Sequence, residues 1–122
     1  MAMSHLDMQK QLIRSGCKEK YRVEKVIRYW LPKSKHVFYL ERENISPQIV
    51  LLPALEVFLD ELSSLDGVIT KPPYYHNADM TMFPKRVNNG EKATHYGVAF
   101  EFENSPAVEN FIAKLTEIVS KK

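Results

Sequence analysis

Two segments of this chain carry side chains that could recognise or react with a ligand. The first, residues 74–96, combines aromatic, histidine and cationic residues: Tyr75, His76, Lys85, Arg86, His95 and Tyr96. Such a mixture on a surface loop suits recognition of a protein or of an anionic ligand, with Lys85 and Arg86 exposed to solvent. In the structural alternative, Phe83 and Tyr96 only fix the loop to the core. Our first hypothesis is a non-enzymatic binding or adaptor domain that uses residues 74–96.

The second segment, residues 10–36, is basic. It holds nine Lys or Arg residues against two acidic ones, a net charge of +7, whereas residues 40–70 hold one Arg against six acidic residues. Cations for phosphates together with aromatic rings for bases are what single-stranded nucleic-acid surfaces combine. The candidate residues are Lys20, Arg22, Arg28 and Trp30. Strand alternation favours another outcome, in which the rings enter the core and the charges face solvent. Nucleic-acid binding is therefore an alternative hypothesis.

A third hypothesis is a small enzyme that uses His76, Asp79 and His95, brought together if the long loop folds back on the last strand. A zinc site needs three or four ligands, usually closely spaced, whereas the four histidines and the single cysteine are scattered. Cys17 follows a helix-ending glycine, which is the wrong helix end for activating a thiol. We therefore predict no metal, no cofactor and no catalytic residue, and a packing role for Cys17.

Length and composition indicate one globular domain over residues 1–122. The chain is 44% hydrophobic and 26% charged, with a formal net charge of +2, values ordinary for a folded protein. No apolar run approaches membrane-spanning length, and the N-terminus lacks the apolar core of a signal peptide. We expect a cytoplasmic location and no membrane partner. Residues 1–3 are interpreted as a tag or disordered start that precedes the domain.

The pattern of apolar and turn-forming residues predicts an α+β fold. Helices are expected at about 5–15, 53–65 and 106–119, with Ser4 and Ser105 as N-terminal caps. β-favouring residues occupy 17–31, 37–40, 49–52 and 96–102, and the first two runs are expected to form a hairpin. Residues 68–94 are interpreted as a long irregular loop because they contain Pro72, Pro73 and Pro84. The expected architecture is a mostly antiparallel sheet of about four strands with about three packed helices.

A series of short motifs also matches a known family in order and spacing. These motifs lie at residues 13–16, 28–30, 37–40, 50–53, 83–84, 95–98, 102 and 107–112. Through them the chain resembles the small cytoplasmic proteins of unknown function represented by enterobacterial YgaC. The resemblance implies an α+β fold with an antiparallel sheet, and it supplies no activity and no catalytic residue. Lys85 and Arg86 depart from the family pattern, which has uncharged residues there and a shorter following loop.

Overall fold

The computed structural model describes residues 3–87 and 92–121. Within these ranges the chain forms helices α1 (His5–Arg14), α2 (Leu59–Ser63) and α3 (Ser105–Ser120), the 3-10 helix η1 (Pro53–Phe58), and strands β1 (Lys18–Arg22), β2 (Val26–Trp30), β3 (Val37–Glu41), β4 (Gln48–Leu51), β5 (Val68–His76), β6 (Lys85–Arg86) and β7 (Thr94–Phe102). The predicted α+β class is confirmed. The sheet is larger than expected, because the described strands number seven and not about four.

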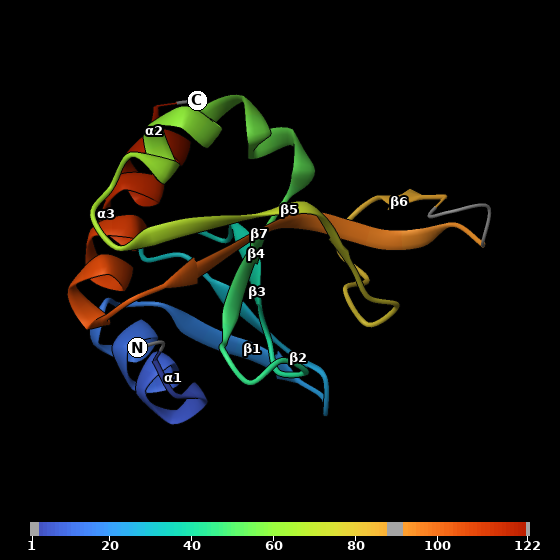
Figure 1. Ribbon diagram of the computed structural model, residues 1–122, viewed down its shortest axis with the longest axis horizontal. Coiled ribbons are helices and arrows are strands. Elements are labelled where there is room, and N and C mark those ends of the chain that lie inside the picture. The colour runs from blue at the N-terminus through green and yellow to red at the C-terminus, as the bar shows by residue number, and fades with distance from the viewer. Residues whose placement is uncertain (1–2, 88–91, 122) are drawn as a thin grey trace.

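All neighbouring strands of the sheet are antiparallel, in the order β1-β2-β3-β4-β7-β5. The short β6 pairs with the start of β7, which extends beyond the rest of the sheet (Figure 1). The expected hairpin is present as β2 and β3. The run at 17–31 contains two strands, β1 and β2, joined by a turn in which Val23 N–H donates to Val26 C=O. This turn was missed because it contains no Gly, Pro or Asn.

The helices cover one face of the sheet, as Figure 1 shows for α1, α2 and α3. We call this the helix side. The ring of Phe111 lies with its centroid 5.0 Å from the rings of both Phe100 and Phe102. Phe111, Ile112 and Leu115 of α3 are all buried, as the apolar periodicity predicts. This layer is the main hydrophobic core, and it fixes the orientation of the strands.

Two helix predictions need correction. The last helix is capped by the Asn104 side chain, which accepts from Ala107 N–H at 3.0 Å, and Ser105 lies inside the helix. The helix expected at 53–65 is the 3-10 helix η1 followed by the five-residue α2. Neither piece has a side-chain cap, and burial of its leucines fixes this segment more than helix propensity does. The Ser4 cap of α1 is confirmed, with Asp7 N–H donating to Oγ at 3.1 Å.

The long loop expected at 68–94 is interrupted by strands, because β5 occupies its beginning and β6 lies within it. Pro72 and Pro73 lie within β5, where the register against β7 shifts between Lys71 and Tyr75. Proline is tolerated there because β5 is an edge strand and the shift relaxes the hydrogen-bonding ladder. The turn expected at Asn88–Gly90 lies outside the described residues.

The connection between β5 and β6 crosses the face of the sheet opposite the helices, which we call the open side. Its Met80 and Phe83 are buried against Tyr39, Val50 and Ala99, a second and smaller apolar cluster. The crossing depends on Gly97 of β7. A Cβ atom at Gly97 would lie 2.5 Å from Leu51 O and 3.0 Å from the Phe83 ring. This glycine therefore provides the space in which the crossing segment contacts the sheet.

Candidate functional site

The β1–β2 hairpin presents one set of side chains to the helices. The register pairs Glu19 with Tyr29 and Arg22 with Ile27, and cross-strand partners lie on the same side of a sheet. Tyr29 and Ile27 are fully buried in the core. Arg22 therefore lies on the helix side, where its guanidinium donates to the Glu19 carboxylate at 2.7 Å and to Gln9 at 3.0 Å.

A β-bulge changes what the other side of the hairpin carries. The register shifts between Glu19 and Tyr21, so that β1 contributes two successive residues to the open side. Tyr21 pairs with Arg28, and the Lys20 ammonium lies over the Trp30 ring. Lys18 pairs directly with Trp30. We call the resulting surface the basic face; it consists of Lys18, Lys20, Tyr21, Arg28, Trp30 and Lys35.

Trp30 is the centre of the basic face. The Nζ atoms of Lys20 and Lys35 lie 4.1 Å and 5.7 Å from the centroid of its ring. Cation–π contacts at exposed positions contribute about 0.5–1 kcal/mol each, so they orient the lysines without holding them rigidly. All five side chains of β1 are exposed, and the indole is half-buried. A flat aromatic group with exposed cations beside it is therefore accessible from solvent.

Arg28 connects the basic face to the crossing segment. Its guanidinium lies 4.9 Å from the Tyr21 ring centroid. Its Nε donates to the Tyr39 hydroxyl at 3.2 Å, and one terminal nitrogen donates to Thr81 Oγ1 at 3.2 Å. These contacts hold the guanidinium in place, so its positive charge has a defined position on the basic face.

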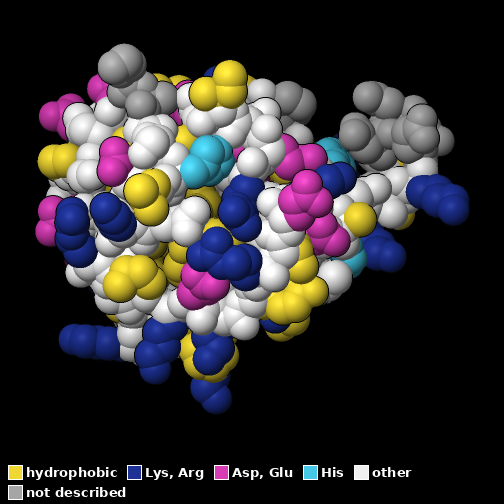
Figure 2. Space-filling model, turned by 90° about the horizontal axis from the view of Figure 1, so that it is seen from below, with side chains coloured by type: hydrophobic (Ala, Val, Ile, Leu, Met, Phe, Trp, Pro, Cys, Tyr) yellow, Lys and Arg dark blue, Asp and Glu magenta, His cyan; other side chains and the backbone are white. Residues whose placement is uncertain are grey.

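Among the described residues, the cations of the basic face form no ion pair with an acidic side chain. In the described part of the chain, ion pairs join Arg22 to Glu19, Lys25 to Glu43, Lys71 to Glu101 and Lys114 to Glu117. None of them involves the basic face. Figure 2 views the molecule from the side of α1 and the β1–β2 hairpin, and Lys and Arg side chains project from its lower edge. Of the residues proposed from sequence, the structure groups Lys20, Arg28 and Trp30 and places Arg22 on the other side.

The candidate residues of segment 74–96 are divided between two sides of an extended arm formed by β5, β6 and β7. The register pairs Tyr75 with Gly97, His76 with Tyr96, and Lys85 with His95. His76, Arg86 and Tyr96 consequently share the helix side, and Tyr75, Lys85 and His95 share the open side. The six residues do not form one site.

On the helix side of the arm, aromatic rings surround Arg86. The guanidinium carbon lies 4.9 Å from the Tyr74 ring centroid and 5.5 Å from that of Tyr96. The His76 ring stacks on Tyr96 with centroids 5.9 Å apart. The Tyr74 hydroxyl donates to the Glu56 carboxylate at 2.6 Å, a hydrogen bond that raises the pKa of Tyr74. Arg86 is exposed, as predicted, and is supported by rings rather than by a carboxylate.

Beside Tyr74 is a small, largely apolar pocket of about 270 Å³. It is lined by Glu56, Leu59, Thr70, Pro72, Tyr74 and Val98. The hydroxyl oxygen of Thr70 is buried without a hydrogen-bond partner among the described residues. Chemically, this pocket can take a small apolar group that also offers one hydrogen-bonding atom.

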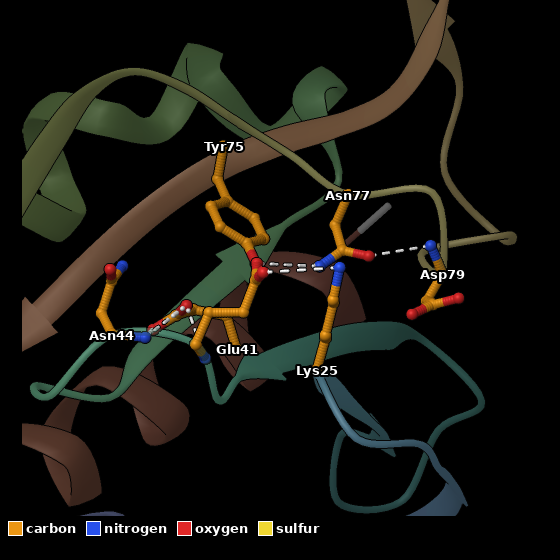
Figure 3. A network of polar contacts seen from close by, with 7 residues as sticks. Lys25, Glu41, Asn44, Tyr75, Asn77 and Asp79 are labelled. Atoms are coloured by element: carbon orange, nitrogen blue, oxygen red, sulfur yellow. Dashed lines mark hydrogen bonds and ion pairs between the residues drawn. The ribbon is translucent and has the colours of Figure 1, made fainter.

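On the open side of the arm, a polar network joins β5 and Asn77 to Glu43, which lies two residues past the end of β3. The Tyr75 hydroxyl and the Asn77 amide both donate to the Glu43 carboxylate, and Lys25 Nζ lies 3.8 Å from the same group. Asn77 also accepts from Asp79 N–H at 2.8 Å (Figure 3). Burial and the bond to Glu43 raise the pKa of Tyr75, so this hydroxyl stays protonated. The network ties the arm to the segment after β3 and so stabilises the fold.

His76 and His95, two of the three residues of the enzyme hypothesis, point to opposite sides of the arm. His76 is on the helix side of the arm, whereas the His95 ring faces the open side and contacts Phe83 O through Nδ1 at 2.6 Å. Among the residues that the structure describes, no group of three or more His, Cys, Asp or Glu side chains could hold a metal ion. Cys17 is buried, and burial raises the pKa of its thiol to about 12. An unactivated thiol suits the packing role proposed for this residue.

Comparisons with family models, with curated proteins and with solved structures give no match. The resemblance to the YgaC family therefore stays a prediction. No helix within the described ranges is both long and apolar enough to cross a membrane.

Sequence reasoning missed Lys18, Tyr21 and Lys35 as members of the basic face. The alternation rule assigns Lys20 and Tyr21 to opposite sides of a regular strand, and only the bulge brings them together. The charged run over residues 18–22 was the available signal, because edge strands often carry such runs together with bulges.

Proposed function

We propose that the protein binds single-stranded nucleic acid across the basic face. The lysines and Arg28 take phosphates, and the rings of Trp30 and Tyr21 stack against bases. The observation that carries the proposal is the bulge in β1, because it brings the Tyr21 ring to the side that already holds Trp30 and the cations of the basic face. In a regular strand Tyr21 would face the helix side, and such separation of rings from cations was the reason to prefer a purely structural interpretation.

The chemistry of the face fits this ligand in two respects. Cations without carboxylate partners need not break an ion pair before they meet a phosphate, so their electrostatic attraction is fully available. Lys20 and Lys35 already rest on the indole, and a base can replace them there while each ammonium moves to the neighbouring phosphate. Stacking on an exposed ring is tolerant of base identity, so we expect little sequence preference.

The experiment that tests the proposal uses the intrinsic fluorescence of Trp30, the one tryptophan of the chain. The probe is a single-stranded oligonucleotide of about ten nucleotides, within the usual size of such sites. Binding at the basic face should quench the emission in a saturable manner at low salt. The triple variant Lys18→Gln/Lys20→Gln/Lys35→Gln should lose most of the affinity and retain the wild-type circular dichroism spectrum.

A charge-matched control separates the site from the overall charge. The triple variant Lys10→Gln/Lys114→Gln/Lys121→Gln removes the same charge from outside the basic face, and we expect nearly wild-type affinity. Equal weakening by both triple variants would mean that only net charge matters, and the proposal would fail. It would also fail if no oligonucleotide quenched Trp30 at low salt.

A second candidate function is recognition of a protein or an anionic ligand by the arm, the function first expected for residues 74–96. The observation in its favour is the exposed Arg86 guanidinium, which lies within cation–π distance of the Tyr74 and Tyr96 rings; Tyr74 also lines the apolar pocket. Replacing Lys85 and Arg86 with alanine should change the free energy of unfolding by no more than about 0.5 kcal/mol. The variant should lose any partner that the wild type retains on affinity capture. Retention of every partner would assign these residues to the ordinary surface.

Both candidates are non-enzymatic, and we place the protein in the cytoplasm, as its sequence led us to expect. Membership of the YgaC-like family belongs to the same proposal. Nucleic-acid binding would extend to other members of that family only where their sequences keep cations and rings at the positions of the basic face.

A further inference from the structure

The basic face ends at a recess of about 300 Å³, between the β2–β3 turn and the connection from α1 to β1. We call it the lysine pocket. Its polar lining comes from Lys18, Lys33, Lys35 and Ser34, and the indole of Trp30 forms one wall. Lys18 and Trp30 belong to the basic face as well, so the recess continues that surface.

The back of the lysine pocket is formed by tightly fitted backbone. Gly16 adopts a φ of +92°, and a Cβ atom there would lie 3.3 Å from the ring of Pro32. Leu31, which is buried, completes this inner wall. The inner side of the recess is therefore lined by backbone and by a buried side chain, and the terminal group of a strand that lies on the basic face can enter it.

The charge of the lysine pocket is unbalanced. Lys18, Lys33 and Lys35 are all exposed, and no carboxylate lies within ion-pair distance of any of them in the described ranges. Three ammonium groups around one recess repel one another unless an anion lies between them. Glu109 lies outside the lysine pocket; it lines a neighbouring recess that shares Lys33, and no ion pair joins the two residues in the described ranges.

Lys33 also has an unusual backbone conformation, with a φ of +60°. This left-handed conformation favours Gly or Asn over Lys, and such conformations concentrate at functional sites. Next to it, Ser34 Oγ accepts from His36 N–H at 3.1 Å, an orientation that lets its own O–H donate to an anion. The turn thus presents a cation and a hydroxyl group at adjacent positions.

We propose that the lysine pocket binds a phosphomonoester, the terminal phosphate of a single strand that lies on the basic face. A terminal phosphate carries close to two negative charges and three acceptor oxygens, whereas a phosphodiester carries one charge. Three ammonium groups and one hydroxyl match the terminal group. The inference rests on the proposed function, and it adds that the protein selects a strand end over an internal site.

The test compares three oligonucleotides of identical sequence with a 5′-phosphate, a 3′-phosphate or hydroxyl groups at both ends. The two phosphorylated probes have equal charge, so a difference between them cannot come from general electrostatic attraction. One of them should bind about tenfold more tightly than the other, as expected for one additional charge-assisted hydrogen bond. The less favoured phosphorylated probe should bind nearly as the hydroxyl probe does.

Lys33→Asn is the matching variant, because asparagine tolerates the left-handed backbone and keeps the turn. It should remove the preference between the two phosphorylated probes and leave the affinity for the hydroxyl probe within about twofold, since Lys33 is not part of the basic face. Lys10→Gln, a lysine on the exposed surface of α1, should keep the preference. Circular dichroism of each variant establishes that it is folded.

Four outcomes would count against the inference. Equal affinity for both phosphorylated probes would overturn the lysine pocket and leave the proposed function standing. A preference that survives Lys33→Asn would also overturn it. Inorganic phosphate is added as a competitor. If it displaces the favoured probe at a phosphate concentration as low as the probe's dissociation constant, the pocket is a site for free phosphate and not for a strand end. If none of the three probes bound, the proposed function itself would fall.

Discussion

Stacking and charge make separable contributions at the basic face, and the most informative variants change one at a time. Tyr21→Leu removes a ring that is 46% exposed and leaves every cation in place. Base stacking on an aromatic side chain contributes about 1–3 kcal/mol, so single-strand affinity should fall about 5- to 150-fold. The dependence of affinity on salt should not change, because no phosphate contact is lost. Tyr21→Phe keeps the ring and should bind like the wild type.

The double variant Lys18→Gln/Lys20→Gln changes the contribution of charge and leaves both rings in place. The basic face has four cations. Each phosphate contact to a single strand contributes about −0.7 to the slope of log affinity against log salt concentration. The wild type should therefore have a slope of about −2.8. Raising the salt from about 50 to about 200 mM should therefore weaken wild-type binding about 50-fold. The double variant should have a slope near −1.4 and lose only about sevenfold over the same range.

The assay is quenching of Trp30 at four or more salt concentrations, with each variant referred to its own unbound emission because Lys20 contacts the indole. The reasoning is refuted if Tyr21→Leu binds as tightly as Tyr21→Phe. It is also refuted if the lysine variant keeps the wild-type slope, since the phosphates would then be bound elsewhere. Heparin, an anionic polymer without bases, should bind Tyr21→Leu and wild type alike.

Four further predictions concern the fold. Phe111→Ala should lower the free energy of unfolding by about 3–5 kcal/mol, and a melting temperature unchanged to within about one degree would show that this ring is not core. Gly97→Ala should cost about 1–3 kcal/mol because a Cβ atom there meets the carbonyl oxygen of Leu51, and wild-type stability in urea would contradict the described crossing. Cys17 should resist alkylation in the native protein and react at the rate of unfolding, since its pKa is raised to about 12. Burial raises the pKa of Glu41 above its ordinary value of 4.5, so the folded state holds this proton more tightly than the unfolded state does. The free energy of unfolding should therefore fall as the pH rises from about 4.5 toward neutrality. The variant Glu41→Gln should lack this fall, as urea titration of both proteins at each pH would show. Parallel pH profiles for the two proteins would disprove the assignment of the fall to Glu41.

A helical period of apolar residues predicted α3 correctly, whereas the same kind of period over 53–65 formed η1 and the five-residue α2. The apolar spacing of α3 identified Phe111, Ile112 and Leu115 as core, and the structure confirms it. The prediction failed where local signals gave no warning. Pro72 and Pro73 mark a loop in most contexts, and only their position on an edge strand makes a strand possible.

The candidate sites were predictable in composition but not in arrangement. Aromatic and cationic residues were found in both segments, yet their grouping depends on register. One extra residue in β1 brings Lys20 and Tyr21 to the same side, whereas regular pairing in the arm separates His76 from His95. Register is set by the contacts of neighbouring strands, which a single segment of sequence does not contain.

The position of β1 at the end of the sheet has a consequence for solubility. Its outer backbone edge has no partner among the described strands, and such an edge can pair with the strand of another molecule. A bulge and a row of charged side chains are the usual protection against such pairing, and β1 has both. Lys18 and Lys20 therefore also act against aggregation. A concentrated solution of the variant that lacks both lysines is where edge-to-edge assembly should first become visible, by light scattering.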